Sequence, residues 1–171
     1  GQYLCQLHRA AYLGDEQVTA NPTSFLGRAP LTDPRLPVRI DLRDYASWLA
    51  GSDPFNDEDR PARPTLRKQG SLEAFTAHLF AARSGGLPAT VATVNDILER
   101  LPVLVVLDGL DEVARPETRQ RVVDEVDRFT ARLRTAFRAQ VIVTTRPNVA
   151  GLAEPSPERF ETIALNRLDE T

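Results

Sequence analysis

One apolar segment that ends in a group of carboxylates constrains this chain more than any other feature. Leu104 to Leu107 are four large apolar residues without polar alternation. This pattern is typical of a strand buried on both faces in a parallel α/β sheet. Asp108, Asp111 and Glu112 follow directly. Since ligands bind at the carboxyl ends of the strands in open α/β sheets, we expect these acids at a ligand-binding edge.

The acidic group predicts a magnesium and nucleotide-phosphate site. Carboxylates this close repel one another unless a metal or a basic group offsets their charge. Asp108 is the expected Mg²⁺ residue, binding the ion directly or through water while the ion bridges phosphate oxygens. Gly109 leaves room for the water shell and the phosphates. Asp111 and Glu112 lie one turn further, where either carboxylate could act as the general base toward water.

A second apolar strand, expected over residues 140–145, should end at the same edge. It delivers the hydroxyls of Thr144 and Thr145 and the guanidinium of Arg146. Thr145 and Arg146 are the expected phosphate-binding residues, because a guanidinium forms charge-assisted, often bidentate bonds to phosphate oxygens. The alternative is that Arg146 only neutralises Asp111 or Glu112. The two roles are compatible.

The remaining pattern predicts alternating strands and helices. Further strands are expected over residues 37–42 and 160–165, and helices over 2–13, near 45–49, after the capping residue Ser71, over 91–101 and from Pro116 onward. The polar stretch 51–70 is interpreted as a solvated insertion loop, with a partner-docking loop as the alternative. This order of elements predicts an α/β fold with a parallel sheet and helices on both faces.

Composition excludes several classes of function. With 171 residues the chain fits one domain, and 21 basic and 24 acidic residues leave a net charge of −3 without a basic face for nucleic acid. No apolar segment approaches the roughly 20 residues needed to cross a membrane. Cys5 is the only cysteine, which rules out an internal disulfide and favours a reducing, cytoplasmic compartment.

Two motifs resemble the NACHT branch of the STAND P-loop NTPases. They are Leu-Val-Val-Leu-Asp-Gly-Leu-Asp-Glu-Val at 104–113 and Val-Ile-Val-Thr-Thr-Arg-Pro at 141–147. The small residue after Asp108 and the additional acidic pair are the specific part of the likeness. Val38 to Asp41 also resembles the second strand of that family, and Tyr3 to Tyr12 resembles the helix after its phosphate loop.

The resemblance implies a three-layer P-loop NTPase-like fold that binds ATP or GTP with Mg²⁺ and acts as a conformational switch. Proteins of this family carry sensor and effector domains in the same chain and self-associate, commonly in innate immunity or bacterial antiviral defence. By this resemblance Asp108 is the magnesium residue, Asp111 and Glu112 are the hydrolytic acids, and Arg146 is the sensor arginine.

One family motif is missing from the sequence. The loop Gly-x-x-x-x-Gly-Lys-Ser/Thr, which supplies a lysine and a backbone cradle for phosphates, does not occur. We therefore expect residues 1–171 to be a NACHT-type domain truncated at both ends, beginning just after this loop and lacking the first strand. Two alternatives stay open. One is a nucleotide-binding scaffold without hydrolysis, and the other is a metal-dependent nuclease with Asp41 as a further carboxylate.

Overall fold

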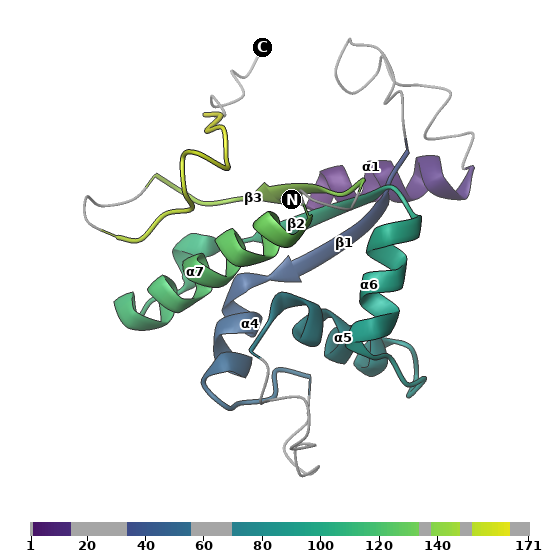
Figure 1. The fold of residues 1–171 in the computed structure, drawn as a ribbon, viewed down its shortest axis with the longest axis horizontal. Coiled ribbons are helices and arrows are strands. Elements are labelled where there is room, and N and C mark those ends of the chain that lie inside the picture. Colours follow the sequence, from purple (N-terminus) through teal and green to yellow (C-terminus); the bar gives the residue numbers. More distant parts are fainter. Residues whose placement is uncertain (1, 15–33, 56–69, 134–137, 148–151, 165–171) are drawn as a thin grey trace, which may run out of the picture.

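A three-stranded parallel sheet forms the centre of the fold (Figure 1). The computed structural model describes residues 2–14, 34–55, 70–133, 138–147 and 152–164. The strands are β1 (Leu36–Asp41), β2 (Val103–Asp108) and β3 (Gln140–Val143), in the order β1-β2-β3. Both strand pairs are parallel. The predicted α/β class with a parallel sheet is therefore confirmed for the described residues.

The strand β2 lies in the middle of this sheet, as its apolar sequence predicts. Its residues Val103 to Leu107 are all buried, and only Asp108 at the end is partly exposed. In the register, Asp41 lies opposite Asp108 on one side, and Leu107 lies opposite Val143 on the other. The carboxyl ends of the three strands therefore meet at one edge.

One face of the sheet carries the main hydrophobic core. Alternate strand residues such as Ile40 and Leu107 point into this core, where they join apolar residues of the helices that follow β1 and β2. The contributing helices are α4 (Leu42–Leu49), α5 (Leu72–Arg83), α6 (Val91–Arg100) and α7 (Pro116–Leu133).

The opposite face is associated with α1 (Gln2–Leu13). Leu104 and Val106 are buried but lie outside the main core cluster, as the alternation of side chains along a strand requires. The helix α1 packs beside β1, on the other side of the sheet from α4, α5 and α6 (Figure 1). In the described residues, helices therefore lie on both faces.

Local sequence explains where several helices begin. The side chain of Asp41 accepts a hydrogen bond from the Arg43 amide and starts α4 directly after β1. Ser71 caps α5 as predicted, accepting from the Ala74 amide at 3.2 Å. Thr90 begins α6 with a reciprocal capping box.

The strand expected over residues 160–165 is wrong for its described part, because residues 160–164 form no strand. The Ser156 carbonyl accepts hydrogen bonds from the Arg159 and Phe160 amides at 2.9 and 3.1 Å. These local bonds form a turn and use amides that a sheet ladder would need. Phe160 packs against the core instead. β3 is also shorter than expected, ending at Val143.

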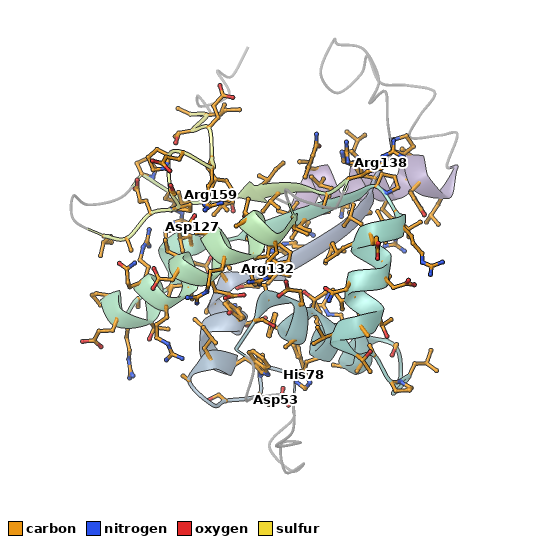
Figure 2. All side chains as sticks on the ribbon, viewed as in Figure 1. Asp53, His78, Asp127, Arg132, Arg138 and Arg159 are labelled. Carbon is orange, nitrogen blue, oxygen red and sulfur yellow. The ribbon has the colours of Figure 1, made fainter. Side chains whose placement is uncertain are left out.

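The predicted insertion loop 51–70 falls largely outside the described residues, which include only 51–55 and 70. Its described start is docked on α5. Asp53 lies 2.9 Å from the Nε2 atom of His78 (Figure 2), and the ring of Phe55 packs against Phe75 with 5.6 Å between centroids.

Among the described residues, no helix combines enough length with enough apolar character to cross a bilayer.

Candidate functional site

The acidic group occupies the carboxyl edge of the sheet, as the sequence predicts. Gly109 follows β2 with a φ of 77° and turns the chain into the short 3₁₀ helix η1 (Leu110–Glu112). The Leu110 amide donates to the Thr144 carbonyl at 3.0 Å, and the Thr144 amide donates to the Leu107 carbonyl at 2.9 Å. These bonds attach residues 109–112, here called the acidic turn, to the end of β3.

Asp108 is held by groups from both neighbouring strands. On the β1 side, the Arg39 guanidinium contacts its Oδ2 atom through Nε at 2.8 Å and Nη2 at 2.7 Å. On the β3 side, the hydroxyl of Thr144 donates to Oδ1. The same hydroxyl accepts from the Gly109 amide at 3.1 Å, so Thr144 orients the carboxylate and the turn together.

These contacts set the ionisation of Asp108. Partial burial is the largest single factor and acts to raise its pKa, but the hydrogen bonds from Thr144 and Arg39, together with nearby positive charge, hold the pKa below its ordinary value. The side chain keeps 20% of its surface exposed. Asp108 is therefore an ionised carboxylate that reaches the solvent rather than a dry interior.

Asp111 pairs with Arg146, which follows β3. The Oδ1 atom of Asp111 accepts from the Arg146 amide at 3.2 Å, and its Oδ2 atom lies 3.5 Å from the Arg146 Nε. The neutralising contact considered from the sequence is therefore present. Because 85% of the Arg146 side chain is exposed, its guanidinium has room to turn toward another anion.

Glu112 approaches the start of α4, the helix that follows β1. Its Oε2 atom is 3.6 Å from Arg43 Nη1, at the start of α4. Arg43 also approaches Asp41, with 3.9 Å between the charged atoms. Glu112 is the most exposed of the three acids, with 46% of its side chain accessible.

Each acid of the group thus has an arginine partner within the chain: Arg39 for Asp108, Arg146 for Asp111 and Arg43 for Glu112. Basic side chains therefore offset the mutual repulsion that the sequence pattern implies. As a result, charge density alone does not require a metal here. The position of Asp108 at the carboxyl end of β2 is the feature that favours a metal.

Two residues of this site were not singled out from the sequence as partners of Asp108. The first is Thr144, which contacts the carboxylate, whereas the hydroxyl of Thr145 donates to the Arg146 carbonyl at 3.1 Å. The second is Arg39. Its signal was a charged residue inside an apolar strand, two positions before Asp41 and therefore on the same face.

The described residues offer magnesium one suitable carboxylate. They contain no group of three or more histidine, cysteine or acidic side chains arranged to hold a metal ion. Magnesium sites commonly use one or two carboxylates, several waters and substrate phosphates. The ionised, partly exposed Asp108 matches this donor chemistry, provided that Arg39 gives up its contact with Oδ2.

Comparison of the chain with known proteins adds no further assignment. Neither protein-family models, nor curated proteins, nor solved structures yield a match.

Proposed function

We propose that this chain is the nucleotide-binding core of a NACHT-type STAND P-loop NTPase. In this proposal, ATP or GTP binds with Mg²⁺ at the carboxyl edge of the sheet, and slow hydrolysis resets a conformational switch in a multidomain signalling or defence protein. Sensor and effector domains belong to the same protein, which self-associates. The proposal includes the three-layer P-loop NTPase-like fold.

One observation carries this proposal. Asp108, the acidic turn and Arg146 come from the ends of adjacent parallel strands and lie in contact at one edge. Ligand sites of open α/β sheets are found at this edge. An ionised carboxylate beside an exposed guanidinium matches the chemistry of a metal-bound triphosphate.

The geometry supports distinct roles for the acids. Asp108 is the residue that would hold magnesium, which when bound neutralises charge on phosphate oxygens. Glu112 is the stronger candidate for the general base, because it is more exposed than Asp111 and has one ion-pair contact of 3.6 Å. Asp111 instead positions Arg146, whose exposed guanidinium would contact phosphate beside Thr145.

The direct test measures steady-state hydrolysis of ATP and GTP by the full-length protein with and without Mg²⁺. The Asp108→Ala variant is expected to lose about 100-fold or more of the magnesium-dependent turnover. Asp96→Ala is the matched control, since Asp96 is an exposed acid on α6 that pairs with Arg100 and lies outside the candidate site. Equal turnover in wild type and Asp108→Ala rejects the metal role.

A non-hydrolysing, nucleotide-binding scaffold is the second candidate function. It is favoured by the observation that Asp111 and Glu112 both have arginine partners, which lowers their availability as bases. Measuring oligomer size and turnover with nucleotide in wild type and Glu112→Gln separates the two. Loss of turnover in Glu112→Gln, with assembly retained, supports a hydrolytic switch. Nucleotide-dependent assembly without turnover in either protein supports the scaffold.

A further inference from the structure

Arg39 contacts Asp108 in the way expected of a substitute cation. Two of its N–H groups, on Nε and Nη2, converge on the single oxygen Oδ2. Thr144 holds the other oxygen. A cation that binds Asp108 through Oδ2 has to compete with both of these charge-assisted bonds.

The energy of this competition is modest. Arg39 keeps 43% of its side chain exposed and Asp108 keeps 20%, so the ion pair is partly hydrated. Pairs of this kind contribute little to stability because water and salt screen them. The contact is therefore strong enough to define the ligand-free arrangement and weak enough to be exchanged.

A second acidic environment lies within reach of Arg39. A cavity of about 80 Å³ is lined by Arg39, Asp41 and Asp44, together with Arg83 of α5 and apolar residues. Burial is the main factor that raises the pKa of Asp44, with the Asp41 charge next, while the charges of Arg43, Arg83 and Arg39 oppose both. A guanidinium that left Asp108 would thus find two carboxylates at its own strand end, which it would share with Arg43 and Arg83.

We propose that Arg39 is an internal counter-ion with two positions: it occupies the Asp108 carboxylate in the empty site and moves toward Asp41 and Asp44 when a divalent cation binds. This inference rests on the proposed metal role of Asp108. It adds a regulatory step, since cation binding has to release Arg39 and thereby couples the site to the β1–α4 connection.

The test uses Mn²⁺ alone as a paramagnetic probe of the 171-residue chain labelled with ¹⁵N. Broadening of the Gly109 and Thr144 amide signals gives an apparent affinity. Arg39→Gln is expected to bind Mn²⁺ about three- to ten-fold more tightly than wild type, because the competing charge is gone. Arg39→Lys keeps the charge but loses the paired N–H groups, and should fall between them.

Two further variants serve as controls. Arg100→Gln removes an arginine from an exposed ion pair on α6 and should leave the affinity unchanged. Asp108→Asn should abolish the broadening. In wild type, adding diamagnetic Mg²⁺ should shift the Arg39 side-chain Nε–Hε signal as the contact with Asp108 is lost.

The outcomes separate this inference from the proposed function. Tighter binding by Arg39→Gln, with a shifted Arg39 signal in wild type, supports the counter-ion. Equal affinity in wild type and Arg39→Gln, lost in Asp108→Asn, overturns the competition while leaving the metal role intact. Absence of broadening in all folded variants overturns both.

Discussion

Gly109 is the point at which the chain leaves β2 and enters the acidic turn. Its φ of 77° lies in the left-handed region, which costs other residues about 1–2 kcal/mol. A Cβ atom at this position would lie 3.4 Å from Glu112 Cδ, an ordinary van der Waals contact. Backbone conformation, rather than lack of space, therefore explains the glycine.

We expect Gly109→Ala to lower the free energy of unfolding by about 1–2 kcal/mol, as measured by urea denaturation. Gly85→Ala is the matched control, because Gly85 has a φ of 72° and nothing within 4 Å of its added Cβ. The two losses should be similar, and Gly109→Asn should be milder because asparagine tolerates this conformation. A neutral Gly109→Ala beside a destabilised Gly85→Ala would contradict this explanation.

His8 predicts a pH dependence of stability near neutrality. The side chain is buried, and its Nδ1 atom accepts from the Arg35 amide at 3.2 Å. Burial first, and then the charge of Arg35, lower its pKa from the ordinary 6.5. The unfolded chain therefore takes up a proton before the folded chain does. Stability should be lost as the pH falls below about 6.5 and level off below the folded pKa.

The comparison is between wild type and His8→Asn, whose side-chain oxygen can replace Nδ1 as the acceptor. Urea midpoints measured between pH 8 and pH 5 should fall more steeply for wild type than for the variant. Parallel curves would show that His8 does not carry this dependence.

The helices α5 and α7 are joined by a partly buried ionic network. Arg132 donates to both oxygens of Glu73 at 2.7 and 2.8 Å and to Glu125 at 2.7 Å (Figure 2 labels Arg132). Glu125 also accepts from the Leu72 amide and from Arg128. The network thus connects the start of α5 to the middle of α7.

Arg132→Ala is expected to lower the free energy of unfolding by about 2–3 kcal/mol, because it leaves Glu73 buried without its partner. This figure lies below that for a fully buried pair, since 43% of the Arg132 side chain is exposed. Arg100→Ala, which breaks an exposed pair on α6, should change stability by less than about 0.5 kcal/mol. Equal effects in urea denaturation would refute the network's contribution.

The elements themselves were largely predictable because their signals are local. The apolar run of β2, the cap at Ser71 and the proline at the start of α7 each act within a few residues. The strand expected near Phe160 failed because a turn at Ser156 took its amides, and the sequence does not show which bonds those amides form.

The contacts within the site were less predictable than the edge at which they lie. Arg39 and Asp108 are 69 positions apart, and their contact depends on the register between β1 and β2. The choice of Thr144 over Thr145 depends on where β3 ends, which pattern alone locates only within a few residues. The sequence predicted which strand ends meet at this edge, but the side-chain pairing depends on tertiary structure.

Arg119 joins three separate parts of the fold. It is almost fully buried on α7, and it donates to the Leu110 carbonyl of the acidic turn and to the Ala153 carbonyl beyond β3, both at 2.8 Å. Its Nη2 atom has no hydrogen-bond partner among the described residues. Nearby on α7, Asp127 accepts from the Ser156 amide at 3.1 Å (Figure 2 labels Asp127).

Arg119→Leu should lower the free energy of unfolding by about 1–3 kcal/mol, because the Leu110 and Ala153 carbonyls each lose a hydrogen bond from the buried guanidinium. Limited proteolysis should also cut faster within 152–164, since the hydrogen bond from Arg119 on α7 to Ala153 is gone. Arg121→Leu, an exposed arginine on the same helix, is the matched control and should change neither property. Unaltered proteolysis of a destabilised Arg119→Leu would contradict the tie.

The order of the strands has a mechanical consequence for the charges at this edge. Asp108 is carried by the central strand, whereas Arg39 and Arg146 are carried by β1 and by the chain after β3. Shear between the strands would separate the opposite charges and strengthen the negative potential at the edge. Any displacement of an outer strand would therefore change how strongly this edge attracts a cation.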